Sequence, residues 1–232
     1  MNITQFRYSA DNFSYLVYGP KTAIAIDPGA VDDILDYVSE HDLILHYVTN
    51  THSHPDHTSG NSGILQKSSA RFLNFTTLSS SESIELDGEV LKVYHTPGHM
   101  ADCITFHHGP FLITGDTLFN GTIGNCFSGD MNAFFQSIRF LAGFDKNTRV
   151  YAGHDYVQEA MTYARIMDPD NPDIDPYLAS INPADLYTTV GDELKVNPYL
   201  RYNVPYLVEK LKQSGLNVDT EFDRFNSMYE FG

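Results

Sequence analysis

Positive charge is scarce in this sequence. Its 14 lysine and arginine residues face 30 aspartate and glutamate residues, which gives a formal net charge of −16. A surface of that sign repels the phosphates of nucleic acids and of anionic membranes, so we expect neither as a partner. An anionic substrate would need a local positive site, and bound metal ions could supply one.

Cysteines and long apolar runs are scarce as well. Cys103 and Cys126 are too few for a disulfide framework and favour a reducing compartment. The first residues show no basic segment followed by an apolar one, and no apolar run approaches the length of a membrane span. These absences predict a cytoplasmic protein. Its 232 residues suffice for one large domain, with or without a small appendage.

Metal-ligand side chains, in contrast, are crowded into one stretch. Within Thr51-His-Ser-His-Pro-Asp-His57, four residues could ligate a metal: His52, His54, Asp56 and His57. The stretch over 43–49 is apolar and partly β-branched, and 58–61 carries helix-start residues, so we expect the group on a strand-to-helix loop. Imidazole nitrogen and carboxylate oxygen are ligands for Zn²⁺, Fe and Mn²⁺. A chance grouping in a polar loop is the alternative, but so dense a cluster is rare.

Three more candidate ligands each follow an apolar stretch and a glycine. They are His99 in Val93-Tyr-His-Thr-Pro-Gly-His99, Asp116 in Phe111-Leu-Ile-Thr-Gly-Asp116 and His154 in Arg149-Val-Tyr-Ala-Gly-His154. Three strands that each end in a ligand residue would not be expected by chance. A carboxylate has two oxygens and can bridge two cations. The set therefore divides into His52, His54 and His99 on one ion and Asp56, His57 and His154 on the other, with Asp116 shared.

Turn signals and periodicity outline the rest of the chain. Alternating or apolar stretches predict strands over 2–8, 12–18, 22–26, 43–49, 71–75 and 84–95, the last with a tight turn at Asp87-Gly88. Helical spacing predicts helices over 31–40, 130–144, 157–167, 175–187, 205–214 and 219–230. The change from strand-rich to helix-rich sequence after His154 predicts a boundary between residues 1–154 and 155–232. Asp27, in Asp27-Pro-Gly29, is either a turn residue or a carboxylate that orients a metal-bound histidine.

At these residues the sequence resembles the metallo-β-lactamase superfamily, and within it the glyoxalase II (hydroxyacylglutathione hydrolase) family. The shared motifs are Thr51–His57, His95-Thr-Pro-Gly-His99, Thr114-Gly-Asp-Thr-Leu-Phe119, Gly153-His-Asp-Tyr156 and Asn197-Pro-Tyr-Leu-Arg201. The resemblance implies an α/β fold, an αββα metallo-β-lactamase-like sandwich with the metals at one edge of the two sheets, followed by a C-terminal all-helical region. It also implies two divalent metal ions, Zn, Fe or Mn, with a bridging water that attacks the substrate.

The likeness to glyoxalase II implies a small-molecule thioester substrate, S-2-hydroxyacylglutathione, hydrolysed to a 2-hydroxy acid and a free thiol; we expect a monomer or a homodimer. Tyr156 matches a family tyrosine that contacts glutathione, and an ordinary buried tyrosine is the alternative. The chain departs from the family at Gly124-Asn-Cys-Phe127, where Asn125 stands at a lysine position and Phe127 at a tyrosine position. Asparagine lacks the charge that would grip a glutathione carboxylate, so Arg201 is the remaining candidate for that charge.

Other activities share these motifs. A persulfide dioxygenase uses one iron and would need only His52, His99 and Asp116, which leaves the second ligand set without a role. A lactonase or a β-lactamase-like hydrolase stays open, because the metal centre alone does not select the acyl substrate. A flavin-linked diiron oxygen reductase typically has a glutamate where His54 stands. An inert metal-binding scaffold would be marked by a missing ligand, and none is missing.

Overall fold

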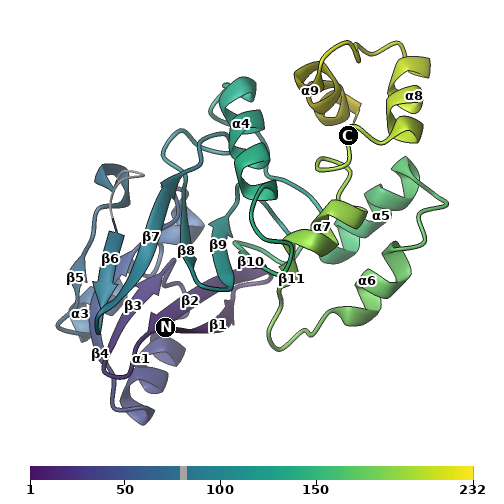
Figure 1. Ribbon diagram of the computed structural model, residues 1–232. Coiled ribbons are helices and arrows are strands. Elements are labelled where there is room, and N and C mark those ends of the chain that lie inside the picture. The colour runs from purple at the N-terminus through teal and green to yellow at the C-terminus, as the bar shows by residue number, and fades with distance from the viewer. Residues whose placement is uncertain (79–82, 232) are drawn as a thin grey trace.

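Two mixed β-sheets face each other in the computed structural model, which describes residues 1–78 and 83–231 (Figure 1). The first sheet has the order β1-β2-β3-β4-β5 and the second the order β11-β10-β9-β8-β7-β6. The strands of the first are β1 (Asn2–Tyr8), β2 (Asn12–Tyr18), β3 (Thr22–Ile26), β4 (Ile44–Thr49) and β5 (Arg71–Phe72). Those of the second are β6 (Ser83–Leu86), β7 (Glu89–His95), β8 (Ile104–His108), β9 (Phe111–Gly115), β10 (Arg149–Ala152) and β11 (Thr188–Thr189). Parallel pairs β3–β4 and β9–β10 bring strand ends to one edge.

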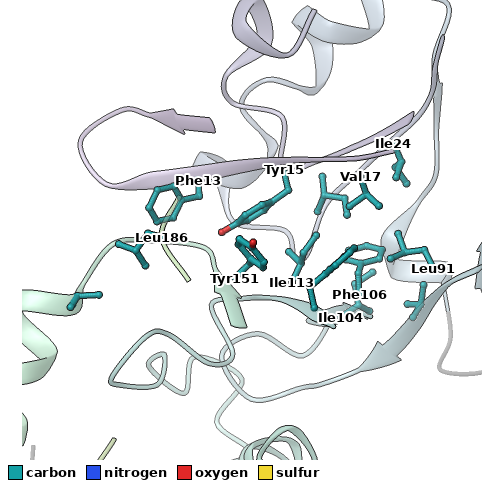
Figure 2. Close-up of a cluster of buried hydrophobic side chains, with 14 of the residues drawn as sticks. Phe13, Tyr15, Val17, Ile24, Leu91, Ile104, Phe106, Ile113, Tyr151 and Leu186 are labelled. Atoms are coloured by element: carbon teal, nitrogen blue, oxygen red, sulfur yellow. The ribbon is translucent and has the colours of Figure 1, made fainter. Parts of the chain in front are cut away.

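Period-two alternation fills the space between the sheets. Phe13, Tyr15 and Val17 of β2 point into the shared core, whereas Leu16, between them, packs on the outer side. Figure 2 shows the inward side chains of β2 lying against side chains from the second sheet. The Tyr15 ring meets the Tyr151 ring of β10 edge-on, with 5.7 Å between the ring centroids. The two sheets are therefore held in contact directly behind the strand ends.

Helices cover the outer face of each sheet. Those inserted among the strands are α1 (Val31–Glu40), α2 (Pro55–Thr58), α3 (Asn61–Lys67) and α4 (Met131–Ala142). Ile34 of α1 and Ile64 of α3 share an apolar cluster with Leu16 of the first sheet. Ile138 of α4 shares another with Leu112 of the second sheet. The αββα sandwich implied by the resemblance is thus confirmed.

The C-terminal region is helical and continues the second sheet by one short strand. Its helices are α5 (Val157–Met167), α6 (Ile174–Ser180), α7 (Val190–Val196), α8 (Pro205–Gln213) and α9 (Glu221–Phe231). Between α6 and α7 the chain returns to the sandwich, where β11 pairs antiparallel with β10. Across residues 1–78 and 83–231, no helix combines the length and apolarity needed to cross a membrane.

Two predicted elements have the wrong extent. The strand expected over 71–75 stops at Phe72, and a 3₁₀ turn follows over Phe75–Thr77. The helix expected over 175–187 stops at Ser180, because Asn182 precedes a proline and that position disfavours helix. Helix α7 was not predicted, although Thr189 and Asp192 form a capping box at its start, a signal that apolar periodicity overlooks.

A buried carboxylate fastens α7 to the sandwich. Glu193 is fully buried, and each of its oxygens accepts two hydrogen bonds. Oε1 accepts from the hydroxyls of Tyr177 and Thr188, at 2.9 and 2.7 Å. Oε2 accepts from the Gly121 amide at 2.8 Å and from the Asn197 side-chain amide at 3.0 Å. Gly121 belongs to the loop after β9, so this carboxylate joins the helical region to a loop of the sandwich.

Candidate metal centre

The seven predicted ligands meet at one edge of the two sheets. His52 and His54 follow β4, Asp56 and His57 lie in α2, and the others follow strands of the second sheet: His99 after β7, Asp116 after β9 and His154 after β10. One group of ligand atoms comes from His52, His54, His99 and Asp116, and a second from Asp56, His57 and His154. Within each group these atoms lie within 4.8 Å of one another. The histidines and Asp56 fall into the two sets that the sequence predicted, and Asp116, predicted to be shared, groups with the first set.

Asp116 lies between the two groups. Its Oδ2 is 3.5 Å from His99 Nε2 in the first group and 3.4 Å from His154 Nε2 in the second. Its Oδ1 is 3.3 Å from His57 Nε2, yet this buried oxygen accepts no hydrogen bond among the described residues. An orphaned carboxylate oxygen among imidazoles is the arrangement that a cation would complete. The residues therefore fit a pair of divalent ions that share Asp116.

Outer hydrogen bonds fix the ring nitrogens of His99 and His52. Nδ1 of His99 lies 2.9 Å from the Asn125 carbonyl, which therefore accepts its proton. Nδ1 of His52 lies 3.0 Å from the Thr51 hydroxyl, and that hydroxyl donates to Asp27. Both rings are left with Nε2 facing the interior of the site. Partners of this kind set the tautomer of a metal-binding histidine and raise its basicity.

Asp27 supports the second group from behind. Its Oδ2 lies 2.9 Å from His57 Nδ1, and its Oδ1 accepts the Thr51 amide at 2.8 Å. The side chain is fully buried, and the backbone at Asp27 has a φ of 52°, which a turn residue such as aspartate tolerates. Asp27 therefore makes the turn after β3 and also contacts a candidate ligand, so its two interpretations are compatible.

His54 faces the centre through Nδ1, whereas His52 and His99 face it through Nε2. Its Nδ1 lies 3.0 Å from His52 Nε2 and 2.9 Å from His99 Nε2. The outer side of the His54 ring meets the Phe127 ring edge-on, with 5.6 Å between centroids. Three ring nitrogens at such separations point at one position, which suits an ion with imidazole ligands.

Glycines let the loops approach closely enough to form the site. A Cβ on Gly153 would lie 2.0 Å from Asp116 Oδ1 and 2.8 Å from a carbon of the His57 ring. A Cβ on Gly124 would lie 2.0 Å from the Asp116 carbonyl and 2.8 Å from His99 Nδ1. Neither separation is sterically allowed, so any side chain at Gly153 or Gly124 would push the ligands apart.

Burial and nearby carboxylates shift the pKa values of the candidate histidine ligands in opposite directions. Burial lowers the pKa of His52 to about 4 and also lowers that of His99, which keeps both rings in the neutral form that binds metals. Burial opposes the charged form of His57 too, but Asp27 and Asp116 outweigh it and raise its pKa well above the usual range. Burial would raise the pKa of Asp116, but His154 and His57 hold it well below its usual range. The ionised carboxylates therefore draw positive charge to this half of the site.

A cavity of about 340 Å³ opens beside the ligands. Its remaining lining is largely apolar and aromatic and consists of Phe119, Ile123, Gly124, Asn125, Phe127 and Tyr156. Tyr156 stacks on His154, with ring centroids 5.0 Å apart and planes inclined by 5°. Phe127 is 63% exposed and forms part of the rim. Tyr156, Asn125 and Phe127, all predicted to bind substrate, thus lie in one cavity with the candidate ligands.

Arg201 lies elsewhere. Its Nη2 is 2.7 Å from a carboxylate oxygen of Asp168, and both side chains are largely buried. None of the cavity-lining residues within the described ranges is a lysine or an arginine. The structure gives no support to Arg201 as the positive charge for a thiol carboxylate, because that charge is already paired with Asp168.

The sequence analysis missed two side chains behind the second group. Asp11 Oδ1 lies 3.0 Å from His154 Nδ1, and the Asn12 side-chain amide donates to Asp56 Oδ2 at 2.9 Å. Asp11 lies between the strands predicted over 2–8 and 12–18, and Asn12 is the first residue of the second of them. The available signal was the adjacency of two hydrogen-bonding side chains at a hairpin, which is common in turns without any function.

Comparison with protein families divides the chain at the end of the sandwich. The model described as metallo-beta-lactamase superfamily matches residues 10–73 and 70–154. The model described as hydroxyacylglutathione hydrolase C-terminus matches residues 155–228. A protein of Pseudoalteromonas translucida named hydroxyacylglutathione hydrolase is 32% identical over 84% of this chain and 82% of its own length. One of the same name from Chromohalobacter salexigens is 29% identical over 94% of this chain and 93% of its own length.

Solved structures share the fold at lower sequence identity. ETHE1 from Myxococcus xanthus superposes with a TM-score of 0.71 at 22% identity, over all of this chain and 92% of its own. The B3 metallo-beta-lactamase BLEG-1 superposes with a TM-score of 0.65 at 20% identity, over 86% of this chain and 99% of its own. At these identities the likeness concerns the fold alone.

Proposed function

Because the chain belongs to the metallo-beta-lactamase superfamily and carries the hydroxyacylglutathione hydrolase C-terminus, we propose that it is a binuclear metal-dependent thioester hydrolase. Its substrate would be an S-2-hydroxyacylglutathione such as S-lactoylglutathione, cleaved to a 2-hydroxy acid and a free thiol. Residues 1–154 would hold the metals, and 155–232 would help to bind the thiol half. We place the activity in the cytoplasm, in a monomer or homodimer that acts on a small molecule.

The position of Asp116 carries the proposal. Its Oδ2 lies 3.5 Å from His99 Nε2 of the first group and 3.4 Å from His154 Nε2 of the second, and its Oδ1 lies 3.3 Å from His57 Nε2. When bound, two divalent cations would lower the pKa of a shared water from ~15.7 towards 7 and polarise a thioester carbonyl. Asp27 and Asn125 keep the ligand rings oriented, as described above. No serine or cysteine nucleophile is then required.

Tyr156 would meet the substrate as a hydrogen-bond donor. Burial raises its pKa to about 12, so the phenol stays protonated at neutral pH. Its ring is held against His154 and edge-on to Phe119, at 5.0 Å between centroids in both contacts. A rigid ring beside a candidate ligand can place its hydroxyl on a substrate near the metals. The open rim at Phe127 would accommodate the less deeply bound thiol half.

A thiol-release assay tests the reaction. Metal-loaded protein should release thiol from S-lactoylglutathione and from other acylglutathiones faster than it opens a lactone or a β-lactam. Metal-depleted protein should be inactive and should recover when Zn²⁺, Fe²⁺ or Mn²⁺ is restored. Lactone or β-lactam turnover without thioester turnover would reject the proposed substrate class.

The number of bound ions is a separate prediction. After saturation with Zn²⁺ or Mn²⁺ and dialysis, elemental analysis should find two ions per chain, because both ligand groups are complete. A single tightly held iron, with oxygen consumption in place of thiol release, would favour the persulfide dioxygenase instead. That alternative leaves Asp56, His57 and His154 without a role.

Substitution of Asn125 by lysine should improve the use of glutathione thioesters. Asn125 lines the cavity, which has no cationic side chain among the described residues. A charge-assisted hydrogen bond is worth about 1.5–3 kcal/mol, so kcat/KM for S-lactoylglutathione should rise roughly ten- to a hundredfold, mainly through KM. Its backbone carbonyl would still hold His99, so kcat should change less.

Two controls define the Asn125 experiment. Asn125→Met matches the length of lysine without its charge and should give no gain. A thioester whose thiol lacks the glutathione carboxylates should react with the lysine variant as it does with the parent protein. A gain with both substrates would mean that the new charge acts on the acyl half or on the metals.

A further inference from the structure

The hairpin between β1 and β2 is fastened to the loop that carries His154. The Phe13 amide donates to the Gly153 carbonyl, and the Asp155 amide donates to the Asp11 carbonyl, both at 2.9 Å. Arg7 Nη2 also lies 2.6 Å from an Asp155 carboxylate oxygen. Backbone hydrogen bonds therefore join a turn of the first sheet to a loop of the second sheet, next to the second ligand group.

Two side chains of this hairpin contact candidate ligands. Asp11 Oδ1 lies 3.0 Å from His154 Nδ1, which leaves His154 Nε2 to face the centre. The Asn12 amide donates to Asp56 Oδ2 at 2.9 Å. That oxygen is the one nearest the other ligands, at 3.3 Å from His154 Nε2 and 3.6 Å from His57 Nε2. The hairpin thus orients two of the three side chains in the second group.

The first group has different support. His99 is oriented by the backbone carbonyl of Asn125 and His52 by the hydroxyl of Thr51. Neither partner belongs to the hairpin. Exposure differs as well, because the side chains of Asp11 and Asp56 are 39% and 46% exposed, whereas His52 and His99 are buried.

We propose that the β1–β2 hairpin, through Asp11 and Asn12, sets the affinity of the second ligand group for its ion without affecting the first. The proposal rests on the two-ion centre of the proposed function. An Asp11 carboxylate that accepts from Nδ1 fixes the tautomer of His154 and raises the basicity of its Nε2. Asn12 holds the Asp56 carboxylate in the direction that ligation requires. Asp11 and Asn12 are positioning residues and contact no substrate.

Metal titration tests the inference directly. Metal-depleted protein would be titrated with Zn²⁺ against a competing chelator, and each of the two binding steps would be resolved. Asp11→Asn keeps the shape of the side chain but removes the charge, and Asn12→Ala removes the amide. Each should weaken one step about 10- to 100-fold and leave the other within about threefold. Asp32→Asn, at an exposed carboxylate of α1 that pairs with Lys67, is the charge-matched control and should change neither step.

Ligand variants identify the weakened step. His154→Ala should abolish the step that Asp11→Asn weakens, and His99→Ala should abolish the other. Adding Asp11→Asn to His154→Ala should then have no further effect. The inference would be overturned if Asp11→Asn or Asn12→Ala weakened both binding steps equally. It would also be overturned if neither variant weakened the step that His154→Ala abolishes.

The same titration separates this inference from the proposed function. Parent protein that binds only one ion would overturn the two-ion centre and the hairpin role together. Two ions bound with the selective effect, but without thioester turnover, would support the hairpin role and reject the proposed substrate. Circular dichroism and the unfolding midpoint of each metal-free variant would identify a change that merely unfolds the hairpin, and Asp11→Asn and Asn12→Ala provide independent chances to keep it folded.

Discussion

Replacement of Asp116 by alanine should remove both metal ions and lower thioester hydrolysis by about 10³-fold or more. Among the described residues, Asp116 is the one carboxylate whose oxygens lie within 3.8 Å of histidine nitrogens in both ligand groups. A Lewis-acid centre contributes several kcal/mol to a hydrolytic transition state, and about 4 kcal/mol corresponds to a factor of 10³ in rate. The measurements are kcat/KM and the metal content after dialysis.

Asp56→Ala provides the comparison for Asp116. Asp56 belongs only to the second group of candidate ligands and is half exposed, so its loss should leave one ion bound while hydrolysis still falls by orders of magnitude. Far-UV circular dichroism should be unchanged in both variants, because neither side chain belongs to an apolar cluster. Two ions and a near-normal rate in the Asp116 variant would reject the shared carboxylate.

Substitution of Glu193 by alanine should have the largest effect on stability. Four donors would lose their acceptor: the Tyr177 and Thr188 hydroxyls, the Gly121 amide and the Asn197 side chain. Each buried unpaired donor costs about 1–3 kcal/mol, but water that enters the vacated space would satisfy some of them. We expect the free energy of unfolding to fall by about 3–5 kcal/mol and the melting temperature by roughly 6–20 °C.

Two further variants separate the possible causes at Glu193. Glu193→Gln keeps the shape but turns an amide group towards two donors, so it should also destabilise the fold, by less than alanine does. Glu209→Gln removes the same charge from an exposed position of α8 and should have an effect within about 0.5 kcal/mol. A melting temperature for Glu193→Ala equal to that of the parent would mean that the four donors find other partners.

The candidate ligands were predictable because each follows a strand whose end is marked in the sequence. Apolar stretches before His99, Asp116 and His154 predicted strands, and parallel pairing brings β9 and β10 to the same edge. The side chains that orient the ligands were harder to predict from the sequence. Nothing in the sequence shows that Asp11 faces His154, because that contact joins residues 143 positions apart across two sheets.

The C-terminal region shows why local signals fall short. The apolar positions of 175–187 fit helical spacing, yet the chain must leave the helix at Ser180 to bring Thr188 against Val150 of β10. The proline after Asn182 ends the helix, and long-range pairing together with the hydrogen bonds of Glu193 then decides where the chain returns to the sheet. Arg201 is a similar case, because its motif fits a substrate contact while its partner in space is Asp168.

The pairing of β11 with β10 also bears on aggregation. Within residues 1–78 and 83–231, only Thr188 and Thr189 pair with the outer side of β10, at Val150 and Arg149. A chain cut after the sandwich would leave β10 as an open edge with unpaired amide and carbonyl groups, next to Val150 and Tyr151, which are buried in the whole chain. Open edges of that kind recruit strands from other molecules. The helical region therefore also shields the sandwich from intermolecular strand addition.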